Sequence, residues 1–271
     1  MEHRNRFLFN LVRANLSRLF QKRKVLIPEP LKRNSYNWLG HATVSIDLDG
    51  TRIMTDPLFE NSFGIFRRWY VLLPKHHADP DIVLITHGHM DHFSKKTIRK
   101  FRKDIHIVTP PGYAVRLKPL GFRNIHELPY GAETTVHGVT ITAYEANHDG
   151  RRYYKGNDGN TNAYRIENRD CSIMFVGDTA YTDRLDGIES DIAFLPVGCY
   201  IPESLRYMHG DPDDIFRIFK GMRSRMFFPI HHSTYQFALD DDEATLRILS
   251  DMAKEDERIF IGEMGKTYPI K

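Results

Sequence analysis

The sequence predicts an α/β (α+β) protein built as a four-layer αβ/βα sandwich, in which two β-sheets pack face to face and helices cover their outer faces. The apolar run 82–85 is followed by segments that alternate between helix and strand patterns up to residue 128. From residue 139 the pattern is mostly strand. The chain has 271 residues, 41% of them hydrophobic, which is enough to bury the core of one such domain.

The N-terminal segment, residues 1–24, has the pattern of a basic amphipathic helix. It holds seven Lys or Arg residues and one acid, which gives it a charge of +6. The whole chain has a net charge of +3, so residues 25–271 together carry −3. Its apolar residues fall on one stripe, namely Leu8, Leu11, Val12, Leu16, Leu19 and Phe20. Such a helix either lies on an anionic membrane surface or packs on protein, and the sequence leaves both open. Pro28 and Pro30 end the segment, so residues 1–30 are predicted as helix and linker and residues 31–271 as the main domain.

No secretory signal or transmembrane helix is expected, because no long uncharged apolar run is present. The two cysteines, Cys171 and Cys199, fit a reducing compartment. We therefore expect a cytoplasmic protein, peripheral on the inner face of a membrane if the helix binds lipid. The basic charge is confined to the N-terminus, and no nucleic-acid partner is expected.

The domain is predicted to open with a β-hairpin. Val44, Ile46 and Leu48 alternate with polar residues, and Asp49-Gly50 forms the turn into strand 52–54. Residues 58–73 are strongly apolar. They either pack on the core or a second subunit, or they line an acyl-chain groove or touch a bilayer, with Arg67 and Arg68 meeting phosphates. His76 and His77 follow in a polar turn and are predicted to lie on the surface.

The run His87-Gly88-His89-Met90-Asp91-His92 places four metal-competent side chains within six residues, directly after the apolar run 82–85. A loop leaving a rigid strand can hold ligands while one side of an ion stays open. Imidazole suits zinc, and a carboxylate beside it favours a site that also binds water. The sequence therefore predicts a metal site here.

The remaining elements are predicted from periodicity and from turn residues. Helices are expected at 94–103, where Ser94 is the N-cap, at 112–119 and at 213–221. Strands are expected at 105–109, 124–128, 139–144, 161–167, 172–176, 192–197 and 227–234, and the last of these ends in His231 and His232.

The His-x-His-x-Asp-His run resembles the signature of the metallo-β-lactamase superfamily. Further matches are Trp38-Leu39-Gly40-His41, Thr55-Asp56-Pro57, Asn147-His148-Asp149-Gly150 and Gly177-Asp178-Thr179. From Leu195 to Thr234 the chain is most similar to the N-acyl-phosphatidylethanolamine phospholipase D-like family. The resemblance covers roughly residues 36–265 and implies the same sandwich fold.

The resemblance implies a two-zinc hydrolase in which a hydroxide between the ions is the nucleophile. One zinc would take His87, His89 and His148, the other Asp91, His92 and His231, and Asp178 would bridge them. Asp91 would also aim the hydroxide. His209 would hold the phosphate or protonate the leaving group, although capping the following helix is an alternative role. Iron or manganese could replace zinc, and His232 is the alternative to His231.

Other residues are expected around this centre. The resemblance gives Asp56 the role of orienting a ligand histidine. It also makes His41, the last residue of the Trp38-Leu39-Gly40-His41 match, a candidate for supporting a ligand or contacting the substrate. Arg151, Arg152 and Tyr200 are candidates for contacts with a charged substrate. The expected substrate is a phosphodiester, such as an N-acyl-phosphatidylethanolamine-type phospholipid. The alternatives are a lactonase or carboxylic-ester hydrolase of a soluble metabolite, and a di-iron redox or binding protein on the same fold. The oligomeric state stays open.

Overall fold

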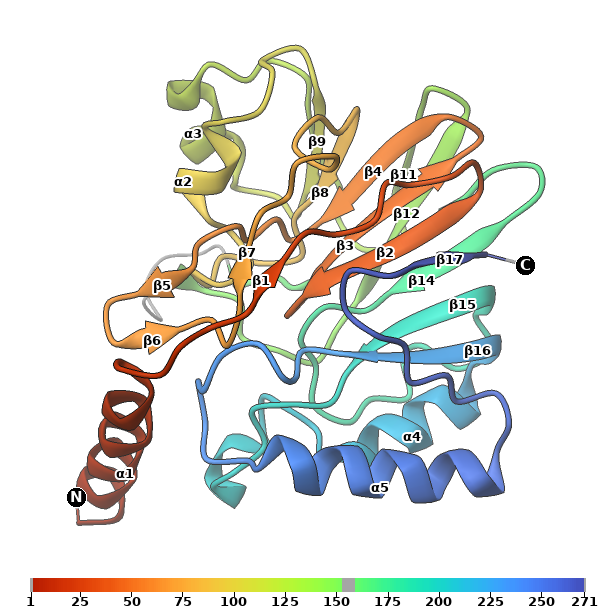
Figure 1. The fold of residues 1–271 in the computed structure, drawn as a ribbon. Coiled ribbons are helices and arrows are strands. Elements are labelled where there is room, and N and C mark those ends of the chain that lie inside the picture. Colours follow the sequence, from red (N-terminus) through yellow and green to blue (C-terminus); the bar gives the residue numbers. More distant parts are fainter. Residues whose placement is uncertain (1, 153–158, 271) are drawn as a thin grey trace.

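The computed structural model describes residues 2–152 and 159–270, which fold into two β-sheets packed face to face (Figure 1). The first sheet has the strand order β10-β9-β8-β4-β3-β2-β17. Its strands are β2 (Ser35–Gly40), β3 (Thr43–Leu48), β4 (Thr51–Thr55), β8 (Ile82–Leu84), β9 (His106–Thr109), β10 (Ile125–Glu127) and β17 (Thr267–Pro269). Strand β4 is parallel to β8 and β8 is parallel to β9, so the connections between them cross over the outer face of the sheet.

The second sheet has the order β11-β12-β13-β14-β15-β16. Its strands are β11 (Glu133–Val136), β12 (Val139–Glu145), β13 (Asn162–Glu167), β14 (Ser172–Phe175), β15 (Glu189–Pro196) and β16 (Arg223–Ile230). Strands β14, β15 and β16 are parallel, so the loops that follow them leave from the same edge.

Three apolar clusters hold the layers together, and together they confirm the predicted four-layer sandwich. The largest lies between the two sheets, where Tyr36, Phe194 and Phe228 pack edge to face. A second cluster joins the second sheet to α4 (Pro212–Gly221) and α5 (Asp242–Glu255). A third joins the first sheet to α2 (Lys95–Ile98) and α3 (Ala114–Leu117). Figure 1 shows these helices on the two outer faces.

Most predicted elements are present, but several helices are shorter than expected. Ser94 does cap α2, because its hydroxyl accepts from the Thr97 N–H. The helix nevertheless ends at Ile98 instead of residue 103, and Arg102 turns away to pair with Asp79, Asp81 and Asp104. The predicted helix 112–119 is α3 followed by a 3₁₀ turn, η1 (Lys118–Leu120).

The N-terminal segment forms α1 (Glu2–Arg18), which extends from the body at the lower left of Figure 1. Its predicted continuation to residue 24 is wrong. The chain turns at Leu19, and the linker instead forms β1 (Val25–Leu26), which pairs with β7 (Val71–Leu72). Among the described residues, no helix combines the length and the apolar character needed to cross a bilayer.

The apolar excursion 58–73 is only partly core. Leu58, Phe59 and Leu72 are buried, and the short strands β5 (Ser62–Phe63) and β6 (Phe66–Arg67) carry two phenylalanines toward a cavity. Arg68 does not fit the alternative in which it meets phosphate, because it is 0% exposed and donates to the carbonyls of Leu39 and Leu58. The 3₁₀ turn η3 (Glu203–Leu205) lies farther along the chain and also faces this cavity.

His77 was also predicted to lie on the surface, and this is wrong. The residue is 3% exposed, and its Nε2 donates to the Glu29 carbonyl at 2.8 Å, which fastens the linker to the domain.

Candidate metal centre

The predicted ligands come from loops that leave neighbouring strands, and these loops converge on Asp178. This carboxylate follows β14 and is 1% exposed. Its Oδ1 lies 3.1 Å from His231 Nε2, and its Oδ2 lies 3.2 Å from His92 Nε2 and 3.7 Å from His87 Nε2. A carboxylate with two oxygens can therefore face two groups of donors at once.

The first group consists of His87, His89, His148 and Asp178, whose ligand atoms all lie within 4.8 Å of one another. His148 Nε2 lies 3.2 Å from His89 Nδ1. Two imidazole nitrogens bound to a tetrahedral zinc ion at 2.0–2.1 Å would lie about 3.3 Å apart. The observed separation therefore fits two ligands of one ion.

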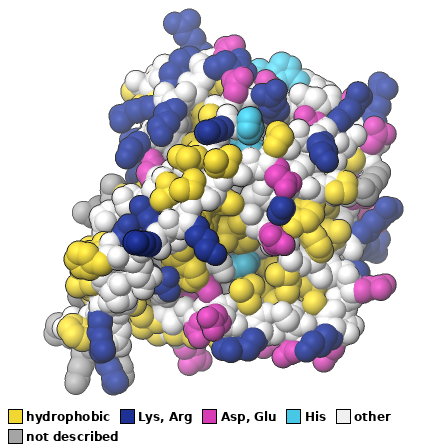
Figure 2. All heavy atoms as spheres, viewed as in Figure 1, with side chains coloured by type: hydrophobic (Ala, Val, Ile, Leu, Met, Phe, Trp, Pro, Cys, Tyr) yellow, Lys and Arg dark blue, Asp and Glu magenta, His cyan; other side chains and the backbone are white. Residues whose placement is uncertain are grey.

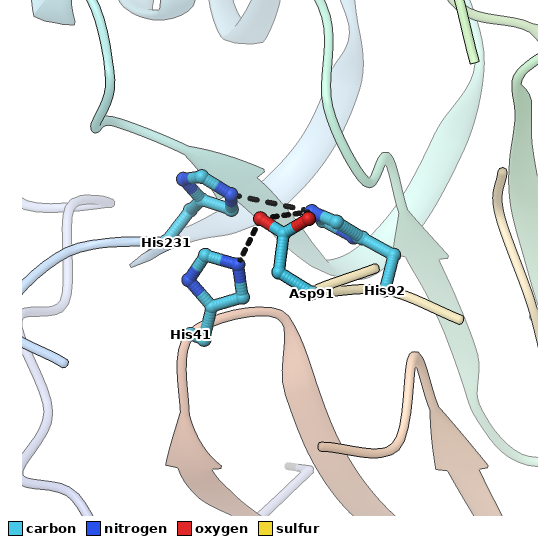
Figure 3. A group of neighbouring side chains, drawn as sticks. All are labelled: His41, Asp91, His92 and His231. Atoms are coloured by element: carbon cyan, nitrogen blue, oxygen red, sulfur yellow. Dashed lines mark hydrogen bonds and ion pairs between the residues drawn. The ribbon is translucent and has the colours of Figure 1, made fainter. Parts of the chain in front are cut away.

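The second group consists of His41, Asp91, His92 and His231, and it satisfies the same distance limit. Figure 3 shows the four side chains pointing toward one another from three loops, since Asp91 and His92 are neighbours in the chain. His92 Nε2 lies 3.3 Å from His231 Nε2 and 3.7 Å from Asp91 Oδ2. His41 Nε2 lies 3.0 Å from the same Asp91 oxygen.

Buried hydrogen bonds hold the outward-facing nitrogens of three histidines. His92 Nδ1 lies 2.8 Å from Asp56 Oδ2, and His148 Nδ1 donates to the Met208 carbonyl at 2.8 Å. His87 Nδ1 lies 2.9 Å from the Thr86 hydroxyl, which itself donates to Asp56. With a proton on each Nδ1, each Nε2 keeps its lone pair for the centre of the cluster.

The electrostatics of the cluster favour a positive charge at its centre. Burial lowers the pKa of His148 to about 3, so this imidazole is neutral at pH 7. Burial alone would raise the pKa of Asp178, but His231 and His92 outweigh it and hold that pKa well below its usual range. Burial opposes the charge of His92 too, yet Asp178, Asp91 and Asp56 raise its pKa well above normal. Carboxylates that stay ionised and stabilise a positive charge on His92 would also stabilise a divalent cation at this position.

The buried Nε2 of His87 gives the same indication, because it makes no hydrogen bond within residues 2–152 and 159–270. A buried nitrogen with no hydrogen bond is costly unless something absent from the coordinates binds it. The residues present therefore fit bound metal.

A cavity of about 400 Å³ opens onto the cluster. Polar groups of the cluster form its floor, together with His209 and Arg152. Its walls are mostly apolar and come from α1, the β5–β6 hairpin, and the loops at 199–209 and 237–238, namely Phe7, Phe63, Phe66, Met90, Cys199, Leu205, Phe237 and Ala238. His209 Nδ1 lies 3.8 Å from Asp178 Oδ2.

The structure separates several of the remaining candidates. Asp211, not His209, caps α4, since its side chain accepts from the Asp214 N–H. At the end of β16, His231 enters the cluster, whereas the His232 ring lies against Trp38 with ring centroids 4.8 Å apart.

Two candidates for substrate contact do not line the cavity. The Tyr200 hydroxyl bonds to Thr245 on α5, and Arg151 pairs with Asp149 at 2.6 Å. The neighbour of Arg151, Arg152, does line it, where its guanidinium stacks on Phe93 and donates to the carbonyls of Gly88 and Phe93.

Some residues at the site were not predicted. Phe7 and Phe237 enter the cavity wall from opposite ends of the chain, and no local pattern marks them. Thr86 could have been found, because it directly precedes His87 and its hydroxyl is a natural partner for a ligand histidine.

An αβ/βα sandwich with a buried histidine and carboxylate cluster at its loop edge defines a metal-dependent hydrolase. Residues 51–232 match the beta-lactamase superfamily domain, so the chain belongs to this family. A UPF0173 metal-dependent hydrolase from Methanopyrus kandleri is 26% identical over 238 residues, which cover 85% of this chain and 97% of that protein. The metallo hydrolase from Ignicoccus hospitalis has the same fold, with a TM-score of 0.67 and 19% identity over 86% of this chain and 97% of that one.

A second sequence relative has a more specific name. The N-acyl-phosphatidylethanolamine-hydrolyzing phospholipase D 1 of Caenorhabditis elegans is 28% identical over 232 residues. The match covers 73% of this chain but only 63% of the length of that relative.

Proposed function

We propose that the protein is a zinc-dependent phosphodiesterase that acts on phospholipids of the N-acyl-phosphatidylethanolamine type. The proposal rests on one observation: the cluster of histidines and carboxylates lies at the floor of a cavity of about 400 Å³ with mostly apolar walls. A phosphodiester with long acyl chains matches this cavity, because its negatively charged phosphate would face the polar floor and its apolar acyl chains would face the walls. The name of the Caenorhabditis elegans relative supports the same substrate class.

The ligand sets follow the two groups of side chains. His87, His89 and His148 would hold one ion, Asp91, His92 and His231 would hold the other, and Asp178 would contact both. When bound, zinc makes a hydroxide nucleophile available near pH 7 and neutralises charge on a phosphate oxygen. The chain orients these ligands through Asp56, Thr86 and the Met208 carbonyl.

Two cavity residues are suited to the anionic substrate. Arg152 presents a fixed positive charge beside the cluster, where its side chain is anchored by two backbone carbonyls. His209 lines the cavity and its Nδ1 lies 3.8 Å from Asp178 Oδ2. It can donate a hydrogen bond to a phosphate oxygen or pass a proton to the departing alcohol.

We also propose that α1 contacts an anionic membrane surface, in a protein located at the inner face of that membrane. Leu8, Val12 and Leu16 are exposed at spacings of four residues and continue to Phe20, which is 93% exposed. Exposed Lys and Arg side chains flank this stripe, and Figure 2 shows yellow and dark blue side chains next to each other over α1 at the lower left. The same helix contributes Phe7 to the cavity wall, so a lipid substrate would have a short path from the membrane.

A substrate comparison on metal-quantified protein tests the phosphodiesterase proposal. Zinc-loaded protein should hydrolyse bis(p-nitrophenyl) phosphate and an N-acyl-phosphatidylethanolamine well above a chelated control, with two ions per chain by plasma mass spectrometry. The same preparation loaded with iron or manganese tests the choice of metal. Efficient lactone opening without phosphodiester turnover would contradict the phosphodiesterase assignment in favour of a lactonase or ester hydrolase. Binding of no more than one ion at saturating zinc would contradict the two-ion centre.

A further inference from the structure

We infer that His41 is a positioning residue that holds Asp91 and His231 in place. It thereby sets how tightly the ion of the Asp91, His92 and His231 group, called the second ion below, binds. The inference rests on the proposed two-ion centre and adds a role for a residue outside its ligand sets. His41 lies in the turn between β2 and β3, 50 residues before Asp91 in the chain.

The side chain of His41 acts on Asp91. Its Nε2 lies 3.0 Å from Asp91 Oδ2, as Figure 3 shows, and the residue is 2% exposed. An ionised carboxylate only accepts hydrogen bonds, so His41 is the donor through Nε2–H. A nitrogen that carries a proton has no lone pair for a metal, and His41 therefore acts through Asp91.

The backbone of His41 acts on the other ligand. Its carbonyl accepts from the His231 N–H at 3.0 Å and from the Trp38 indole N–H at 2.8 Å. Its ring also packs on the His231 imidazole, with centroids 3.9 Å apart. One residue thus fixes the side chain of one ligand and the backbone and ring of another.

The turn is built to place this ring. His41 has a left-handed φ of 54° and Gly40 before it has a φ of 100°. A side chain at Gly40 would clash with the Tyr70 hydroxyl, so only glycine lets the chain turn there. Arg68 holds the preceding Leu39 carbonyl at 2.8 Å. A left-handed histidine persists only where its surroundings hold it, and such strain is concentrated at functional sites.

Two substitutions separate this role from that of a metal ligand. Asparagine tolerates left-handed backbone but is too short to reach Asp91, so His41→Asn removes the hydrogen bond. Glutamine offers an amide N–H close to the position of the histidine Nε2, so His41→Gln keeps a donor but not an imidazole ligand. His77→Gln is the matched control, because His77 is another buried histidine with a hydrogen bond and lies outside the cluster and the cavity.

The readout is metal affinity without substrate. Full-length protein is stripped of metal, and zinc is titrated against a chromophoric chelator, with cobalt absorption as a second signal. We expect wild type and His77→Gln to bind two ions. His41→Asn should bind the second ion 10–100-fold more weakly, as for other residues that support metal ligands, with the first ion unaffected. His41→Gln should recover most of the lost affinity.

The outcomes separate this inference from the function proposed above. Wild-type protein that binds only one ion would overturn the two-ion centre, and the role of His41 with it. Two ions in wild type and unchanged second-ion affinity in His41→Asn would overturn the role of His41 alone. Equal losses in His41→Gln and His41→Asn, with both variants folded by circular dichroism, would overturn the positioning role in favour of direct ligation.

Discussion

At the residue scale, His209 is the side chain that best distinguishes a phosphodiester from an uncharged substrate. It lines the cavity and lies near Asp178, where it would meet charge that develops on the substrate. Removing a donor that contacts transition-state charge costs about 10²–10³ in rate. We expect His209→Ala to lower kcat on bis(p-nitrophenyl) phosphate by that factor while both ions are retained.

Tyr207→Ala is the control for this prediction, since Tyr207 lies two residues away, is 69% exposed and does not line the cavity. Steady-state kinetics and metal content on the same samples decide the result. If His209→Ala turned over bis(p-nitrophenyl) phosphate at the wild-type rate, His209 would have no catalytic role and the phosphodiester proposal would be weakened.

The sequence predicted some site residues better than others for a physical reason. Spacing within one loop could place His87, His89, Asp91 and His92 together, because their separation is set by local backbone geometry. Contacts between loops depend on how the sheets pack, as for His41 on Asp91 or Phe7 in the cavity wall. Arg151 and Arg152 show the limit clearly, since adjacent residues with the same chemistry face different environments.

At the element scale, α1 has two faces that the pattern of the sequence did not separate. Leu11 and Asn15 are buried against the domain, and the Asn15 amide donates to the Gln236 carbonyl at 2.9 Å. Arg18 stacks on Trp69 at 4.1 Å. The helix is therefore docked through part of its surface, while Leu8, Val12 and Leu16 remain exposed. Packing on protein and binding to membrane, which the sequence presented as alternatives, can both hold for one helix.

The exposed stripe of α1 predicts binding to anionic vesicles. Replacing Leu8 and Leu16 with serine leaves the buried contacts of Leu11 and Asn15 in place, but removes apolar surface worth about 25 cal/mol per Å² when it is buried in lipid. We expect this double variant to sediment less with phosphatidylserine-containing vesicles than wild type does. Binding of the wild type should fall as salt rises, since the flanking charges are screened.

Val115→Ser is the control, because Val115 is 73% exposed on α3, outside α1, and does not line the cavity. Turnover of a soluble phosphodiester should be the same in all three proteins. If the double variant sediments with vesicles as well as wild type, α1 is not a membrane contact. A dimer that dissociates in the double variant would assign the stripe to a second copy of the chain.

At the scale of the whole molecule, the alternation of helix and strand patterns was enough to predict the sandwich, but not how the chain closes it. The final strand β17 pairs with β2, so the C-terminus completes the sheet in which the domain begins. Helix α5 covers the second sheet beside α4 and was not predicted. With three residues, β17 is too short to show a periodicity in the sequence, and its place is decided by pairing with the otherwise unpaired edge of β2.

His77 joins distant parts of the molecule and predicts that the fold is sensitive to acid. Its Nε2–H donates to the Glu29 carbonyl, and the Glu29 side chain accepts from Lys266 and from the N–H of Thr267, the first residue of β17. The Nδ1 of His77 is buried and makes no hydrogen bond within the described residues, so a second proton there would have no acceptor. Burial accordingly lowers the pKa of His77 below 6.5.

The sign follows from comparing the two states. Below pH 6.5 the unfolded chain takes up a proton at His77 that the folded protein excludes, so stability falls as the pH drops from 6.5 toward the lower pKa of the folded state. One such group changes the free energy of unfolding by at most about 1.4 kcal/mol per pH unit. Asp242 has the opposite effect, because burial raises its pKa to about 6 and its protonation favours the folded state as the pH falls.

We therefore expect His77→Gln, which keeps an N–H for Glu29 and cannot be protonated, to lose less stability than wild type between pH 7 and pH 5. Urea unfolding at saturating zinc measures this, and any metal lost at low pH affects both proteins alike. His76→Gln is the matched control, because His76 is exposed and its replacement should change the pH dependence much less than the replacement of His77 does. Parallel pH profiles for wild type and His77→Gln would show that His77 does not resist protonation in the fold, and would place the acid sensitivity elsewhere in the molecule.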